Sequence, residues 1–132
     1  EGKRGIFSYA KRVSGYDQEQ TPEEVRHKTP DVTHALVNEH PVTGLKALYL
    51  DPATTIGVEG MSDDEGIALL AELAEHATSP EFVYEHEWQA GDIVVWDNAF
   101  LLHRRTAFGV GQNRLLKRTT IRLDADRHLL PG

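Results

Sequence analysis

The sequence predicts a mostly β protein, a sandwich or barrel of jelly-roll type with one packed helix. Three observations support this fold class. Short apolar runs separated by turn residues fill much of the chain after residue 80, a hairpin pattern lies near residue 40, and one segment has a clear helical period. The 132 residues fit one domain. We expect that domain to span 1–132, with an irregular N-terminal segment over 1–32.

The hairpin is predicted from two apolar runs that flank a turn. Residues 35–37 and 45–50 are the runs, and the turn at 41–44 begins with proline and ends with glycine. Residues 51–60, which are rich in small side chains, are expected to form a loop.

The clearest helix is predicted to begin at Ser62. Ser62 and Glu65 have the spacing of a capping box, in which each residue hydrogen-bonds the other at the helix N-terminus. Five apolar side chains recur at helical spacing, and Glu72, Glu75 and His76 fall elsewhere. The five are Leu69, Leu70, Leu73, Ala74 and Ala77. We expect this face to pack on the core.

The remainder of the chain is predicted to be β structure. Strands are expected at 82–88, 93–96, 100–103 and 113–123, joined by turns. The apolar runs at 93–96 and 100–103 indicate buried strands, whereas the last strand mixes basic and apolar residues.

The last predicted strand would place several arginines on one face. Side chains alternate along an extended chain, so Arg114, Arg118 and Arg122 would lie together, with Leu116 and Thr120 between them. Arginine suits a polar cavity because its planar guanidinium can hold a carboxylate or sulfonate through two hydrogen bonds. An exposed sheet face studded with basic side chains is the alternative, and the pattern alone leaves both open.

Composition narrows the class of partner. The net charge of −7 argues against a nucleic-acid partner, and no apolar run approaches the ~20 residues that span a bilayer. The absence of cysteine excludes disulfides and thiolate metal sites. We therefore expect a cytoplasmic protein without nucleic-acid or membrane partners. The basic residues cluster late, between Arg104 and Arg127, which fits either a small-anion site or a simple balance of the acidic middle.

One motif changes the interpretation of His103. The pattern Gly-Asp-x3-Trp-Asp-Asn-x4-His begins at Gly91 and ends at His103, and Arg114 and Arg118 follow eleven and fifteen residues later. It resembles the taurine dioxygenase-like (TauD/TfdA) family of iron(II)/2-oxoglutarate oxygenases, which also contains the 2,4-dichlorophenoxyacetate dioxygenases. The resemblance extends back through the capped helix and the hairpin turn, and covers residues 33–123.

The resemblance implies a double-stranded β-helix (jelly-roll) with flanking helices, here incomplete. It implies an enzyme that uses Fe(II) and 2-oxoglutarate, hydroxylates a small anionic substrate, and releases succinate and CO₂. His103 matches the family's distal iron ligand, Arg114 matches the arginine that binds 2-oxoglutarate, and Arg118 matches the arginine that faces the substrate anion. Asp97 and Asn98 match a turn that aims the histidine.

The sequence departs from the family pattern at the iron site. The family's other two iron ligands come from a His-x-Asp or His-x-Glu motif, which is missing here. None of the seven histidines here has a carboxylate two residues later. The chain could be part of a longer one, a natural half, or a degenerate relative that acts as a non-catalytic anion-binding or interaction module. We expect it to be inactive alone, and to associate with itself as a homo-oligomer or with the missing N-terminal part.

Overall fold

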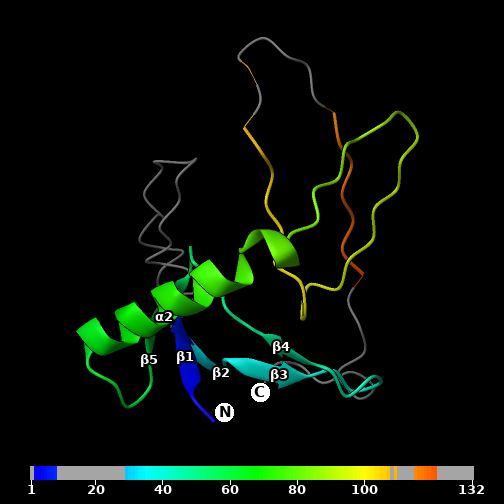
Figure 1. The fold of residues 1–132 in the computed structure, drawn as a ribbon. Coiled ribbons are helices and arrows are strands. Elements are labelled where there is room, and N and C mark those ends of the chain that lie inside the picture. Colours follow the sequence, from blue (N-terminus) through cyan, green and yellow to red (C-terminus); the bar gives the residue numbers. More distant parts are fainter. Residues whose placement is uncertain (1, 9–28, 108, 110–114, 122–132) are drawn as a thin grey trace.

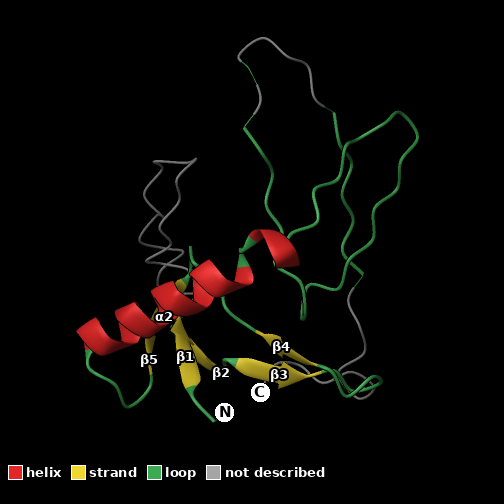
Figure 2. Ribbon diagram, in the orientation of Figure 1, coloured by secondary structure: helices red, strands yellow, loops and turns green. Residues whose placement is uncertain are grey.

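The computed structural model describes residues 2–8, 29–107, 109 and 115–121 (Figure 1). Within them the chain forms a small β body covered by one long helix, from which two loop segments extend (Figure 2). The elements are β1 (Arg4–Phe7), β2 (Val32–Ala35), β3 (Val37–Glu39), β4 (Lys46–Leu48), β5 (Thr55–Val58), α2 (Asp63–Ala77) and the 3₁₀ helix η1 (Pro80–Phe82). No helix in the described part of the chain is both long and apolar enough to cross a membrane.

The larger sheet has three antiparallel strands in the order β2-β1-β5. Its central strand β1 lies inside the segment expected to be irregular, and β5 lies inside the expected loop 51–60. Both are four-residue strands that contain a glycine, so neither shows a readable alternation. The structure explains why residue 5 is a glycine, because a Cβ there would lie 2.7 Å from Cδ2 of the buried Leu36.

The predicted hairpin is confirmed. Strands β3 and β4 pair antiparallel, with Val37 opposite Leu48 and Glu39 opposite Lys46. The turn closes through the backbone, since Gly44 N–H donates to the His40 carbonyl at 2.8 Å and His40 N–H donates to the Leu45 carbonyl at 2.8 Å. Gly44 has a φ of 68°, a left-handed conformation that glycine adopts without a Cβ penalty.

The long helix covers the β body as its apolar period predicted. In Figure 1, α2 lies across the strands β1 and β5. Three residues form the buried core, Leu36, Leu50 and Val58. Helix side chains among those predicted to face inward pack against this core, namely Leu69, Leu70, Leu73 and Ala74. The helix approaches β5 closely at Gly66, where a Cβ would lie 3.2 Å from the Val58 nitrogen.

The predicted capping box is also confirmed. Glu65 Oε2 accepts hydrogen bonds from the Ser62 hydroxyl at 2.7 Å and from the Ser62 backbone N–H at 3.3 Å. These two hydrogen bonds, the hydroxyl first, lower the pKa of the Glu65 carboxyl below its ordinary value. They favour the charged form of the carboxylate at the positive end of the helix dipole.

We expect the Glu65→Ala variant to lose stability in a pH-dependent way. A carboxyl whose pKa is lowered by folding stabilises the fold above its unfolded pKa, and that contribution is lost as pH falls through the folded value. The difference in thermal midpoint between parent and variant should therefore be largest near neutral pH and should shrink on acidification. Melting curves at several pH values measure this difference. Glu72→Ala, which removes an exposed carboxylate from the middle of the same helix, is the control.

The strands predicted after residue 82 are not formed in the described residues. Phe82 belongs to η1, and residues 83–107 and 115–121 have no strand pairing. Their apolar side chains are largely exposed, for example 88% at Ile93 and 87% at Leu115. A strand is stable only when its backbone N–H and C=O groups pair with a neighbour and its apolar face is covered. No described segment after residue 82 does this, so the apolar pattern is present there without a sheet, and the jelly-roll is not seen as such.

Candidate functional site

A compact turn precedes the candidate ligand His103. The Asp97 carbonyl accepts hydrogen bonds from the backbone N–H groups of Phe100 at 3.2 Å and Leu101 at 2.9 Å. Asp97 Oδ1 also accepts from the Ala99 N–H at 2.8 Å. This side-chain to backbone hydrogen bond is typical of an aspartate that starts a turn. The turn predicted at Asp97 and Asn98 is thus confirmed, and it ends two residues before His103.

His103 lies on the exposed loop beyond that turn, rather than at the end of a strand. Its ring packs on the Trp96 indole, with centroids 4.7 Å apart and planes at 47°. The same indole donates its Nε1–H to Asn98 Oδ1 at 2.7 Å. Trp96 and Asn98 therefore connect the turn to the histidine ring.

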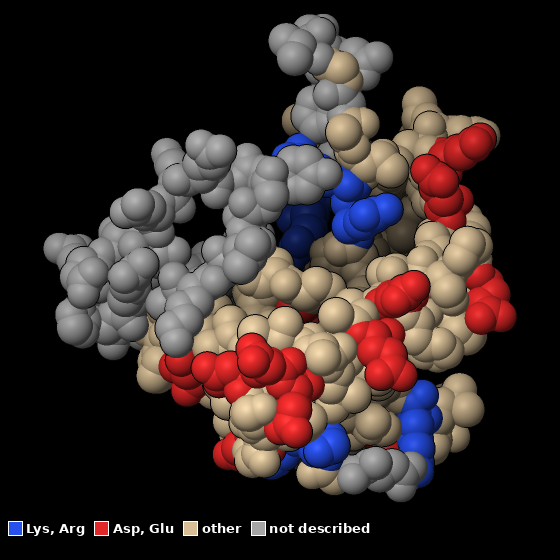
Figure 3. Space-filling model, turned by 60° about the vertical axis from the view of Figure 1, so that its left-hand side comes forward, with Lys and Arg blue, Asp and Glu red and all other residues tan. Residues whose placement is uncertain are grey.

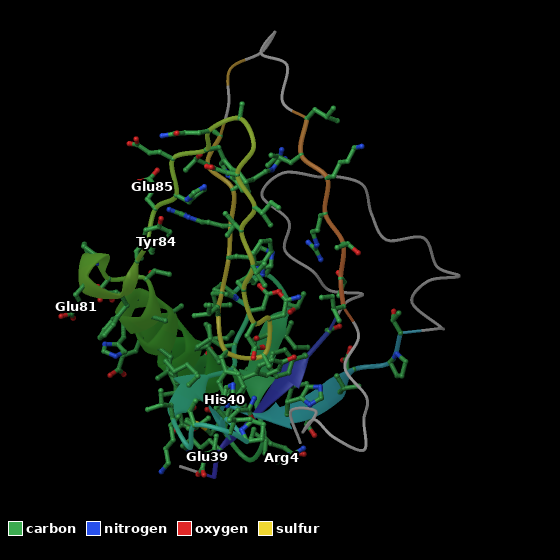
Figure 4. All side chains as sticks on the ribbon, turned by 90° about the vertical axis from the view of Figure 1, so that its right-hand side faces the viewer. Arg4, Glu39, His40, Glu81, Tyr84 and Glu85 are labelled. Atoms are coloured by element: carbon green, nitrogen blue, oxygen red, sulfur yellow. The ribbon has the colours of Figure 1, made fainter. Side chains whose placement is uncertain are left out.

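The hairpin reaches this turn through His40. Its Nε2 lies 3.9 Å from Asp97 Oδ2, and its ring lies 4.7 Å from the Phe100 ring, centroid to centroid. Figure 4 shows His40 beside the sheet, whereas Tyr84 and Glu85 lie out on the loop. His40 comes directly before the turn predicted at 41–44, and no role was predicted for it. No sequence signal identifies this contact, because its partners are far away along the chain.

A second cluster closes the loop between residues 84 and 92. His86 Nε2 lies 3.0 Å from Asp92 Oδ2, and Asp92 Oδ2 also accepts the Gln89 backbone N–H at 2.8 Å. The other His86 ring nitrogen is 3.3 Å from the Tyr84 hydroxyl, and the ring meets Trp88 edge to face at 4.8 Å. The tight turn expected here is present, and these contacts tie its two arms together.

A third cluster lies on the β body. Phe7, His34 and Tyr49 form a triangle of rings with centroids 5.5 to 5.7 Å apart. Burial, and then the nearby Asp51 carboxylate, raise the pKa of the Tyr49 phenol above its ordinary value. Both causes disfavour the phenolate, so Tyr49 serves as a neutral packing residue.

Of the two arginines predicted to bind anions, the structure describes only one. Arg114 lies outside the described residues. Arg118 is exposed, and no hydrogen bond or ion pair to another described residue holds its side chain. Figure 3 shows acidic side chains over much of one face, with one group of Lys and Arg side chains near its upper middle and others at its lower edge.

The described residues do not fit a complete iron site. Among them no group of three or more His, Cys, Asp or Glu side chains could hold a metal ion. The described histidine–carboxylate contacts are pairs, His40 with Asp97 and His86 with Asp92. His103 can supply one ligand, whereas a facial triad for Fe(II) needs two histidines and a carboxylate.

Comparison with known proteins identifies the family. The model for the family described as "Taurine catabolism dioxygenase TauD, TfdA family" matches residues 1–120. The chain belongs to this family. The TauD/TfdA resemblance of the motif ending at His103 is thereby confirmed.

Two curated relatives show how much of a TauD/TfdA protein the chain covers. The alpha-ketoglutarate-dependent 2,4-dichlorophenoxyacetate dioxygenase of Cupriavidus pinatubonensis is 45% identical over 100 residues, which are 76% of this chain and 34% of that protein. The pentalenolactone F synthase of Streptomyces arenae is 33% identical over 84 residues, 64% of this chain and 28% of that protein. The chain thus spans about a third of the length of the curated relatives it matches.

Solved structures agree with this assignment. A Burkholderia xenovorans structure, assigned as an alpha-ketoglutarate-dependent 2,4-D dioxygenase, is similar with a TM-score of 0.67 and 38% identity, over 76% of this chain and 38% of that one. The structure of AAD-2 with Mn(II) and N-oxalylglycine gives a TM-score of 0.57 and 34% identity, over 66% of this chain and 34% of that one. The structural neighbours are TauD-like dioxygenases, and alpha-ketoglutarate is another name for 2-oxoglutarate.

Proposed function

We propose that this chain forms the distal-histidine part of an Fe(II)/2-oxoglutarate-dependent dioxygenase that hydroxylates a small anionic substrate. His103 would ligate iron, Arg114 would bind the far carboxylate of 2-oxoglutarate, and Arg118 would face the substrate's anionic group. The observation that carries the proposal is the family match over residues 1–120, a range that contains His103, Arg114 and Arg118. The Mn(II) and N-oxalylglycine in AAD-2 support a metal and a 2-oxoglutarate site for the family.

The role of each side chain follows from its chemistry. A neutral imidazole is a good ligand for Fe(II), and a fixed ring orientation favours binding. A guanidinium can hold a carboxylate through two parallel hydrogen bonds, which fixes the orientation of the bound anion. Iron and 2-oxoglutarate would supply the oxidative chemistry, while these residues would bind and orient the two anions.

The proposal requires a second contributor to the site. One histidine leaves the metal without its other two protein ligands, so they would come from another polypeptide segment. The exposed apolar side chains of the loops give that segment a surface on which to pack, among them Ile93, Val95 and Leu115. We therefore propose association, either with a second copy or with the N-terminal part of a TauD/TfdA protein.

An anaerobic titration with Fe(II) and 2-oxoglutarate tests this function. Chelation of iron by 2-oxoglutarate at the site would give a visible charge-transfer band. We expect no band from the 132-residue chain alone. We expect a band from a chimera in which this chain replaces the matching third of the Cupriavidus dioxygenase.

Each result of the titration has a clear meaning. A band, or succinate formation, from the chain alone would show that its own residues complete the site and would overturn the one-ligand proposal. A folded chimera without a band would favour the second candidate, a non-catalytic anion-binding or interaction module that keeps the arginines. The exposed, unpaired position of Arg118 among the described residues is the observation that keeps this candidate in view.

A further inference from the structure

We propose that His40 is a positioning residue that holds the turn before His103 and so sets where the His103 ring lies. The proposal deepens the proposed function, and it rests on that function only for the meaning given to His103. It is carried by contacts that join the β3–β4 hairpin to the turn at residues 97–101, two segments far apart in the sequence.

The hairpin fixes the His40 ring in one orientation and one tautomer. Nδ1 accepts the backbone N–H groups of Val42 at 3.1 Å and Thr43 at 3.2 Å. A nitrogen that accepts hydrogen bonds carries no proton, so in the neutral ring the proton is on Nε2. The His40 backbone is held as well, by its hydrogen bonds with Gly44 and Leu45.

The free edge of this fixed ring faces the turn. Nε2 lies 3.9 Å from Asp97 Oδ2, longer than a hydrogen bond but close enough for the N–H dipole to attract the carboxylate. The His40 and Phe100 rings pack at 4.7 Å with planes at 45°. His40 thus contacts both the first residue of the turn and the aromatic residue near its end.

Asp97 uses its two carboxylate oxygens in two directions. Oδ1 accepts the Ala99 N–H inside the turn, while Oδ2 faces His40. The Asp97 carbonyl then accepts the Phe100 and Leu101 N–H groups. Since Leu101 is two residues before His103, a shift of Asp97 or Phe100 is passed directly to the histidine through a short stretch of backbone.

The surrounding exposure explains why such a support is needed. Residues 101–107 are all exposed, and the ring contact of His103 is with Trp96, which belongs to the same loop. Trp96 and His103 therefore move together with the loop. Among the described contacts of the turn, those of His40 come from the β3–β4 hairpin, and they anchor the loop to the β body.

The test uses a substitution that keeps the hydrogen bonds of the ring within the hairpin and removes its contacts with the turn. In His40→Asn the amide oxygen can replace Nδ1 as acceptor for Val42 and Thr43, but the side chain is too short to contact Asp97 and Phe100. The hairpin should remain, and the support of the turn should be lost. His86→Asn is the matched control, because it makes the same change in a histidine whose contacts lie within its own loop.

NMR of the 132-residue chain gives readouts that need no metal. Ring ¹⁵N shifts should show the Nε2–H tautomer for His40. In His40→Asn, the His103 ring protons should lose the shift caused by the Trp96 indole and move to the values of a solvated histidine. Backbone order parameters for 99–103 should fall toward the flexible range below about 0.6. The amide signals of Val42 and Thr43, and those of α2, should stay in place.

The outcomes separate this proposal from the proposed function. A role in stability alone would lower the thermal midpoint of His40→Asn and leave the His103 ring signals of the folded chain unchanged, which would overturn the proposal. An Nδ1–H tautomer for His40, or an equal shift of His103 in His86→Asn, would also overturn it. Altered His103 signals in His40→Asn, together with full activity of a chimera that lacks His103, would support the positioning role and reject the iron-ligand role.

Discussion

We expect the Leu36→Ala variant to be largely unfolded at 25 °C. Leu36 is 3% exposed and shares the buried core with only Leu50 and Val58 among the described residues. Its Cδ2 fills the space above Gly5, so truncation would leave a cavity at the centre of the sheet. Leucine to alanine in a core costs about 2–5 kcal/mol, while domains are stable by only about 5–15 kcal/mol. Because its buried core is this small, the chain should lie near the lower limit of that range of stability.

Urea unfolding followed by the helical circular dichroism of α2 measures this loss. Leu45→Ala is the matched control, since it removes the same atoms from a leucine that is 70% exposed in the same hairpin region. Surface substitutions of this kind usually change the free energy of unfolding by less than about 0.5 kcal/mol. If Leu36→Ala unfolds at the urea concentration of the parent, the cluster around Leu36 is not what stabilises the fold.

Elements set by neighbouring residues could be predicted from the sequence. The capping box of Ser62 and Glu65 joins residues three apart, and the apolar face of α2 repeats within a few turns. The hairpin turn, closed at Gly44, is equally local. In each case the interaction that forms the element lies inside the window in which its pattern is visible.

Elements that depend on distant partners could not be predicted. Strand β1 is only four residues long and is identified by its pairing with β2 and β5, not by its own composition. The opposite error occurs at Ile93 and Val95, which are exposed while Val94 and Trp96 are less so. This alternation of exposure is typical of a β-strand. A strand forms a sheet only when its backbone pairs with a neighbouring strand, and this segment has no such partner among the described residues.

The candidate site divides in the same way. The turn at Asp97 and its position just before His103 both lie within one continuous motif, and both were predicted. The contact of His40 with Asp97 and the contact of His86 with Asp92 were not. These contacts depend on which segments the folded chain brings together, and a single sequence does not show that.

The largest functional effect is expected for His103→Ala in the chimera with the Cupriavidus dioxygenase. Loss of a direct ligand should exceed the roughly 10–100-fold loss in activity or metal affinity that follows from mutating a residue behind a ligand. Succinate formation should therefore fall by more than a hundredfold, and the charge-transfer band with Fe(II) and 2-oxoglutarate should disappear. The exposed position of His103 means that its removal should leave the thermal midpoint of the apo chimera close to that of the parent.

Two variants decide how this loss is interpreted. His76→Ala removes another exposed histidine, from α2, and should keep both activity and the band. Arg118→Ala should keep the band, since 2-oxoglutarate and iron would still bind, but should raise the KM for the anionic substrate. If His103→Ala keeps the band, iron and 2-oxoglutarate bind without this side chain, and His103 is not an iron ligand. If Arg118→Ala then abolishes all anion binding, this chain contributes anion binding through its arginines rather than an iron ligand, because a site that binds iron without the histidine cannot depend on it.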